Sequence, residues 1–202
     1  ILQNGNQLLR SELQDTATTL RQLYANTLLN FNNIEDLQAS ITADYIGKIV
    51  STSGYYDIND GGSGYYIIDN SNAVSDGGSV IQLTGSLRAK LLTTSPNIRQ
   101  FGAKGDGITD DRAAILNAVS FCNLYNTSSL YINSGRYIIS KYILIKNITG
   151  LSIIGDNKAI LVYPSNNPTY LGDSETVLQE GHKSCFLIRL SSNITFKNLN
   201  IE

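Results

Sequence analysis

The sequence predicts a mainly β chain that begins with a coiled-coil helix and ends as a β-solenoid. Three patterns support this prediction. Apolar residues recur every three to four positions over residues 1–41, the tetrapeptide Asp-Gly-Gly-Ser occurs twice among short β-rich runs, and short β-branched runs follow one another closely after Tyr125. With 202 residues, 42% of them hydrophobic, the chain is long enough to bury a core.

The first element expected is a helix within residues 1–44. Twelve positions are spaced alternately four and three apart: Leu2, Asn6, Leu9, Leu13, Thr16, Leu20, Leu23, Thr27, Asn30, Ile34, Leu37 and Ile41. Eight of these twelve residues are apolar. Such a repeat makes one narrow seam that a lone helix cannot bury. We therefore expect a self-associating neck; the alternative is a helix that packs on its own domain.

Residues 45–98 predict a small antiparallel β module. Strands are expected at residues 47–50, 65–69, 80–84 and 89–93, and Asp-Gly-Gly-Ser occupies 60–63 and 76–79, each time shortly before a strand. Tight turns use glycine for positive φ and aspartate to bind the turn backbone. Each turn offers a single carboxylate, whereas calcium needs several oxygen ligands, so we interpret both as structural turns.

The third part, residues 99–202, opens with a glycine-rich segment and a helix. The spacing of Gly102, Gly105 and Gly107 matches neither the dinucleotide nor the P-loop pattern, which excludes nucleotide binding. Asp110 and Asp111 directly precede an apolar stripe that begins at Ile115. We expect both carboxylates to cap that helix rather than to act as a catalytic acid/base pair.

After Tyr125 the pattern predicts the first coils of a β-solenoid. Short strands are expected at residues 130–132, 137–139, 143–145, 151–154, 160–163, 186–190 and 194–201. Three such strands make a coil of about 20 residues, the lower end of solenoid periods. An antiparallel sandwich is the alternative, although its connections would carry stronger hairpin signals.

Composition excludes several classes of function. Fifteen basic and seventeen acidic side chains, without a basic cluster, argue against nucleic acid as a partner. No apolar stretch reaches the ~18 residues of a membrane span. Cys122 and Cys185 lack metal-ligand spacing and are expected to be buried thiols, and we expect no cofactor and no metal. Because residue 1 is Ile and Met is absent, we expect an internal piece of a longer polypeptide.

The segment FGAKGDGITDD (101–111), followed by AAI (113–115), resembles the start of the pectate-lyase-like, right-handed parallel β-helix superfamily. The runs LYINSGRYIIS (130–140), GLSIIGD (150–156) and SNITFKNLNI (192–201) are similar to its rungs, although Asn133 and Ser134 stand where proline is more usual. A leading helix, then a Tyr/Gly-rich module with GYY (54–56) and DGGSGYY (60–66), then this segment resembles bacteriophage tailspikes.

This resemblance implies a homotrimer attached to the virion by its N-terminal part, near other tail or baseplate proteins. It also implies that the helix after residue 111 caps the solenoid, and that the whole β-helix binds and cleaves a bacterial surface polysaccharide, capsule or O-antigen, by hydrolysis or elimination. Catalytic carboxylates normally lie on central rungs, so we expect the active site outside residues 1–202. The alternatives are a noncatalytic fibre or adaptor that binds glycan or another tail protein, and a secreted pectinase-like enzyme.

Within the chain, weak catalytic candidates are Asp173 and Glu175. They lie in a long interruption between the strands at 160–163 and 186–190, together with Tyr170, Glu180, His182 and Lys183. A carboxylate pair beside an aromatic platform is what a glycan-cleaving site needs. The alternative is a solvated loop at a subunit interface.

Two further features are candidate sugar contacts. Asp156 could point to solvent from a corner and bind sugar or calcium, but such a residue more often closes a turn. The pairs Tyr55-Tyr56 and Tyr65-Tyr66 could stack on sugar rings. Strand alternation would bury one member of each pair, so we interpret them mainly as packing residues.

Overall fold

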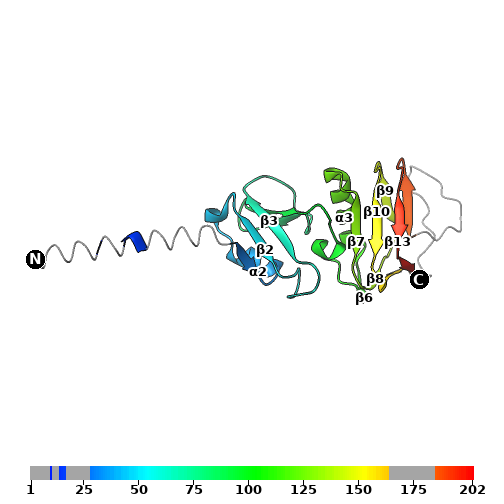
Figure 1. Ribbon diagram of the computed structural model, residues 1–202, viewed down its shortest axis with the longest axis horizontal. Coiled ribbons are helices and arrows are strands. Elements are labelled where there is room, and N and C mark those ends of the chain that lie inside the picture. Colours follow the sequence, from blue (N-terminus) through cyan, green and yellow to red (C-terminus); the bar gives the residue numbers. More distant parts are fainter. Residues whose placement is uncertain (1–9, 11–13, 17–27, 164–184) are drawn as a thin grey trace, which may run out of the picture.

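The computed structural model describes residue 10 and residues 14–16, 28–163 and 185–202. Arg10 and residues 14–16 are helical, and the rest of the predicted neck up to residue 27 lies outside the described residues. Two parts follow one another along the long axis in Figure 1, which we call the sheet module (28–96) and the β-helix (97–163 and 185–202). Their buried apolar residues form one continuous core.

The sheet module is a five-stranded sheet with one short helix. Its elements are β1 (Leu29–Phe31), α2 (Ile34–Ser40), the 3-10 helix η1 (Ala43–Tyr45), β2 (Ile49–Thr52), β3 (Gly64–Asp69), β4 (Val80–Gln82) and β5 (Arg88–Leu92). The strand order is β1-β2-β3-β5-β4. All neighbours are antiparallel except β1 and β2, which run parallel.

The prediction of one helix through residue 41 is wrong from Leu29 onward. Leu29 pairs with Val50 in the sheet, and a new helix starts only after Asn33, whose side chain accepts a hydrogen bond of 2.8 Å from the backbone N–H of Asp36. The seam residues Ile34 and Leu37 are buried within the module. For this stretch, packing on its own domain is therefore correct.

The β-helix starts with η2 (Ile98–Phe101), β6 (Asp106–Asp110) and α3 (Arg112–Tyr125). The strands that follow are β7 (Ser129–Ile132), β8 (Gly135–Ile138), β9 (Ile143–Lys146), β10 (Ser152–Gly155), β11 (Ala159–Val162), β12 (Phe186–Arg189), β13 (Thr195–Lys197) and β14 (Asn200–Ile201). They form three parallel sheets, β7-β10-β13, β6-β8-β11-β14 and β9-β12. The antiparallel sandwich is thereby excluded for the described strands, and the parallel solenoid is confirmed.

Stacked side chains of equivalent strands fill the interior of the β-helix. Leu130 of β7 lies in register with Ile153 of β10, and Tyr137 of β8 with Leu161 of β11, and all four side chains are fully buried. Helix α3 packs on η2, β7 and β9 and buries Ile115, as the apolar stripe predicts. No helix in the described residues is both long and apolar enough to span a bilayer.

Arg99 joins the sheet module to the β-helix. Its guanidinium group donates hydrogen bonds to the backbone oxygens of Asp60 at 2.9 Å and Ser134 at 2.7 Å, and to the Tyr137 hydroxyl at 3.2 Å. The side chain of Gln100 adds a bond of 2.8 Å to the Ser63 oxygen. Hydrogen bonds with a charged donor are among the stronger ones, so this cluster fixes the two parts to one another.

Candidate functional site

The catalytic candidates Asp173 and Glu175 lie outside the described residues, as do Tyr170, Glu180, His182 and Lys183. Their role stays a prediction.

Both Asp-Gly-Gly-Ser turns are built as the sequence predicts. The Asp60 carboxylate accepts hydrogen bonds from the backbone N–H groups of Tyr55, Tyr56, Asp57 and Gly62 at 2.7–3.1 Å. Burial opposes the charge on Asp60, but these four bonds outweigh it and lower the pKa of its carboxyl. Asp76 binds the N–H groups of Gly78 and Val80 in the same way. Both carboxylates therefore stabilise turns by accepting hydrogen bonds from the turn backbone.

The prediction that Asp110 and Asp111 both cap the helix is half wrong. Asp110 accepts from the N–H of Arg112 at 3.1 Å, at the start of α3. The Asp111 side chain makes no cap bond and instead accepts from the N–H groups of Lys104 and Gly105, at 2.7 and 3.0 Å. Asp111 is buried, and this burial raises the pKa of its carboxyl despite the two bonds. It anchors the glycine-rich loop.

Asp106 and Asp156 also close turns. The backbone N–H groups of Thr109 and Ile108 bind the Asp106 carboxylate and lower its pKa to about 2. Asp156 binds the Ser134 hydroxyl and the N–H of Lys158, which confirms that it closes a corner.

The structure places no group of three possible metal-ligating side chains together among the described residues. Cys122 and Cys185 are buried free thiols, and burial raises their pKa values to about 11 and about 12. A thiol that stays protonated is a poor nucleophile and a poor metal ligand.

The sheet module contains a pocket with a volume of about 400 Å³. It lies between α2, the loop after β2 and the segment from Ser75 to β4. Its lining residues are Ile34, Glu35, Gln38, Tyr55, Tyr56, Ser75, Gly77, Ile81 and Gln82. The apolar floor comes from core residues, and the rim is aromatic and polar. An apolar floor with a few polar groups at the rim is typical of small-ligand sites.

The two predicted tyrosine pairs behave differently. On strand β3 the pair alternates as expected, with Tyr66 fully buried and Tyr65 55% exposed. Tyr55 and Tyr56 lie in a loop instead, where strand alternation does not apply, and both rings line the pocket. Their ring centroids are 4.7 Å apart in an edge-to-face arrangement. Burial raises the pKa of Tyr55 to about 12, so its hydroxyl stays protonated.

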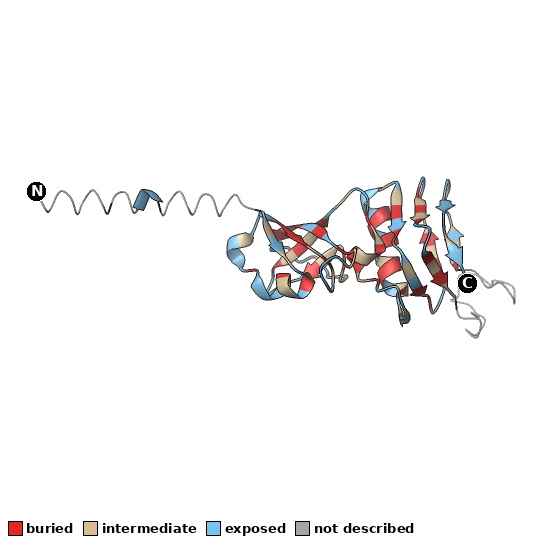
Figure 2. Ribbon diagram, turned by 60° about the horizontal axis from the view of Figure 1, so that its bottom comes forward, coloured by how far each residue is buried: buried red, intermediate tan, exposed pale blue. Residues whose placement is uncertain are grey.

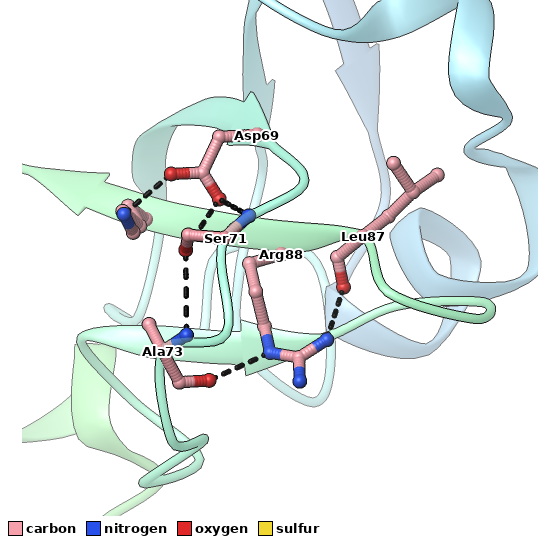
Figure 3. Close-up of polar contacts among 6 residues, drawn as sticks. Asp69, Ser71, Ala73, Leu87 and Arg88 are labelled. Carbon is pink, nitrogen blue, oxygen red and sulfur yellow. Dashed lines mark hydrogen bonds and ion pairs between the residues drawn. The ribbon is translucent and has the colours of Figure 1, made fainter.

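A hydrogen-bonded network shapes the segment that contributes Ser75 and Gly77. Figure 3 shows Arg88 donating to the backbone oxygens of Ala73 and Leu87, at 2.8 and 2.9 Å. The Asp69 carboxylate binds the backbone and hydroxyl of Ser71, whose oxygen in turn accepts from the N–H of Ala73. These hydrogen bonds thus fix the conformation of the segment between β3 and β4, which lies next to the pocket.

The sequence does not predict this pocket. Of its lining residues, the sequence indicates only Tyr55 and Tyr56 as possible sugar contacts, and the apolar repeat places Ile34 in a coiled-coil seam. The three segments that form the pocket are far apart in the chain, and no local motif connects them. The pocket holds a single carboxylate, Glu35, and therefore lacks the carboxylate pair of a glycan-cleaving site.

Comparisons with known proteins identify a family and a fold. Residues 95–201 match the family model described as rhamnogalacturonase A/epimerase, pectate lyase-like. A capsule K30/K69-specific depolymerase of Klebsiella phage K64-1 is 29% identical over 118 residues, which are 58% of this chain and 14% of that protein. This chain thus spans a small part of the relative's length.

Solved structures show the same fold. The tailspike gp49 of Acinetobacter baumannii phage Fri1, a capsular polysaccharide depolymerase, matches with a TM-score of 0.55 and 19% identity over 63% of this chain and 23% of that one. The enzymatically active domain of phage CBA120 tailspike protein 2 matches with a TM-score of 0.56 and 17% identity over 90% of this chain and 25% of that one. The chain therefore resembles phage tailspikes with a parallel β-helix.

Proposed function

Because this chain belongs to the rhamnogalacturonase A/epimerase, pectate lyase-like family, we propose that it is the N-terminal part of a phage tailspike that binds and degrades a bacterial surface polysaccharide. The observation that carries the proposal is the parallel β-helix of residues 97–163 and 185–202, which largely coincides with the family match, together with the similarity of the chain to a capsule depolymerase in sequence. In this proposal the whole protein is a homotrimer on the virion, bound to other tail proteins, and acts at the host cell surface.

The exposure of apolar side chains on the last described coil supports the proposal that the whole protein has further coils. Its inward-facing residues are less covered than their equivalents one coil earlier: Ile145 is fully buried and Ile188 is 43% exposed, while Ile153 is fully buried and Phe196 is 38% exposed. Figure 2 shows this change in exposure toward the strands nearest the C-terminus. Further coils would cover these side chains and provide a longer flank for a polysaccharide.

The direct test is activity of the complete protein on purified capsule or O-antigen. We expect release of reducing ends, and an ultraviolet-absorbing unsaturated product would identify elimination rather than hydrolysis. Asp173→Ala and Glu175→Ala test the candidates in this chain. Unchanged cleavage in both variants assigns the chemistry to other coils.

Trimer formation through the N-terminal helix is tested separately by light scattering. Because β1 and α2 belong to the sheet module, the deletion has to stop at residue 27 to leave that module intact. We expect the full chain to be a trimer and the shortened chain to dissociate. A monomer in both cases would contradict the role of the neck.

A second candidate function is a noncatalytic fibre or adaptor that binds glycan or another tail protein. Six described aspartates, Asp60, Asp76, Asp106, Asp110, Asp111 and Asp156, each bind backbone N–H groups, which supports a structural rather than a catalytic role for this part of the protein. Binding of the complete protein to purified capsule without release of reducing ends would establish this alternative.

A further inference from the structure

The pocket of the sheet module has no part in the proposed cleavage of a polysaccharide. We infer that it binds a neutral sugar unit, a hexose or an N-acetylhexosamine, at a site apart from the chemistry of the β-helix. The choice of a sugar as the ligand class rests on the proposed function, which brings the protein to a polysaccharide. The preference for a neutral unit comes from the pocket itself.

Hydrogen bonds join residues that line the pocket. The Tyr55 hydroxyl donates to the backbone oxygen of Gly77, and the Gln38 side chain donates to the backbone oxygen of Gln82 at 2.8 Å. Its volume of about 400 Å³ lies within the range of small-ligand sites, roughly 300–1,000 Å³. A site fixed in this way loses little freedom when a ligand binds.

Tyr56 provides an exposed aromatic surface at the rim. The side chain is 44% exposed, and its hydroxyl donates to the Gly102 oxygen at 2.9 Å, which fixes the ring to the start of the β-helix. Tyr55 holds the ring from the side. A tyrosine ring presents an apolar face, against which the C–H groups of a pyranose can pack.

The polar groups of the pocket favour a ligand rich in hydrogen-bond donors. The Gln82 amide donates to the backbone oxygens of Leu83 and Gly85, at 2.7 and 2.9 Å, and the Ser75 hydroxyl donates to the Val80 oxygen at 2.8 Å. These donors are directed into the module. The Glu35 carboxylate and the Gln38 carboxamide oxygen are acceptors. Sugar hydroxyl groups can donate to both of them.

The charged groups in and near the pocket lead us to expect different affinities for neutral and acidic sugars. Glu35 carries the carboxyl group among the lining residues, and it is exposed on the first turn of α2. The Lys104 ammonium group lies 5.0 Å from the centroid of the Tyr56 ring but does not line the pocket. A uronic acid whose carboxylate lies beside Glu35 would bring two like charges together, and like charges in a binding site weaken binding.

The test measures sugar binding to the 202-residue chain by saturation-transfer NMR and by titration of protein resonances. The probes are glucose, galactose, N-acetylglucosamine and, as the acidic comparison, glucuronic acid. We expect at least one neutral probe to bind and glucuronic acid to bind more weakly. No transfer to any neutral probe, or equal binding of glucuronic acid, would overturn the inference.

Three variants locate the binding. Tyr56→Ala should weaken binding of the neutral probe about tenfold, which corresponds to the loss of one aromatic contact. Glu35→Gln should raise glucuronic acid binding toward that of the neutral sugar, and because Glu35 is exposed this change leaves the fold intact. The matched control is Tyr65→Ala, which removes an exposed tyrosine outside the pocket and should change neither affinity.

Circular dichroism of each variant verifies that the chain is folded. If Tyr56→Ala does not fold, the Glu35→Gln shift in glucuronic acid binding decides the matter, and its absence rejects the inference. If the pocket variants alter the oligomeric state but not sugar binding, the pocket is a contact between copies of the chain and the inference is wrong. These measurements need no cleavage, so they fail or succeed independently of the capsule assay on the complete protein.

Discussion

The sheet module and the β-helix both bury an apolar core, but different contacts hold their strands together. In the module, antiparallel strands are connected by turns whose aspartates bind several backbone N–H groups, as Asp60 does. In the β-helix, parallel strands stack in register and align identical or similar apolar side chains, as Ile145 of β9 and Ile188 of β12 show. The module thus depends on local polar contacts, and the β-helix on contacts between successive coils.

The comparison predicts that the largest losses come from charges placed inside the β-helix. Ile153→Asp puts a carboxylate into a fully buried position of β10 and should reduce the free energy of unfolding by about 4 kcal/mol or more. The matched control is Ile154→Asp on the same strand, where the side chain is half-buried and faces outward. Urea denaturation followed by tyrosine fluorescence, in a chain without Trp, measures both. Equal losses would contradict the inside and outside assignment of β10.

Two glycines allow the stability cost of an added side chain to be compared between a turn of the sheet module and a packed position of the β-helix. Both Gly85, in the module, and Gly105, at the start of the β-helix, have φ of 63°. A Cβ atom at Gly105 would lie 2.6 Å from the Tyr137 ring, whereas nothing lies within 4 Å at Gly85. Gly85→Ala should cost about 1–2 kcal/mol for the left-handed backbone, and Gly105→Ala roughly 1–3 kcal/mol more for the clash.

Thermal and urea unfolding of the two glycine variants give this difference directly. Because φ is the same at both positions, the comparison of the two variants removes most of the cost of placing alanine in the left-handed region. Variants of equal stability would mean that the glycine-rich segment does not pack on Tyr137 as closely as described.

Two aspartates with opposite pKa shifts give a pH-dependent comparison. Asp60→Asn replaces a charged acceptor of four N–H groups and should lower the free energy of unfolding by about 1–2 kcal/mol at pH 7. Because the folded-state pKa of Asp60 is lowered below 3.8, its contribution is present above about 3.8 and is lost as the pH falls through the folded-state pKa. The difference between wild type and variant should therefore shrink in acid.

Asp111 should behave in the opposite way. Burial raises its folded-state pKa above 3.8, so the folded state takes up a proton before the unfolded chain does. Relative to Asp111→Asn, the wild type should gain stability as the pH falls from 7 toward 3.8 and lose it again as the pH rises through the raised pKa. Denaturation of wild type and both variants between pH 3 and 7 measures these trends, and parallel curves would contradict both.

The strands and turns were predictable because their signals are local. The Asp-Gly-Gly-Ser turns and the β-branched runs carry their own conformational preferences, and the structure places strands within a few residues of the predicted ranges. Strand β6 escaped prediction because the glycine-rich run 105–107 disfavours a strand, and pairing with β8 overrides that preference.

The remaining features depend on contacts between distant parts of the chain. Leu29 forms a strand because Val50 offers a partner, although the apolar repeat around it predicts a helix. The Asp111 side chain does not cap its helix because the N–H groups of Lys104 and Gly105 lie within hydrogen-bond distance of its carboxylate. The pocket likewise forms only where α2, the Tyr55 loop and β4 come together in the fold, so no single stretch of sequence predicts it.

The smallest effects should come from the exposed ion pairs, one in each part of the molecule. Lys90 pairs with Asp69 in the sheet module, and Arg136 pairs with Glu202 across two strands of the β-helix. Both pairs are partly or largely exposed, where solvent and salt screen the attraction, so Lys90→Ala and Arg136→Ala should each change the free energy of unfolding by about 0.2–1 kcal/mol. Unfolding at low salt and in 1 M NaCl measures the electrostatic part, which should vanish at high salt for both variants. A larger loss for Arg136→Ala that persists in 1 M NaCl would show that its aliphatic stem packs on the β-helix, and that coil stacking rather than charge holds this position.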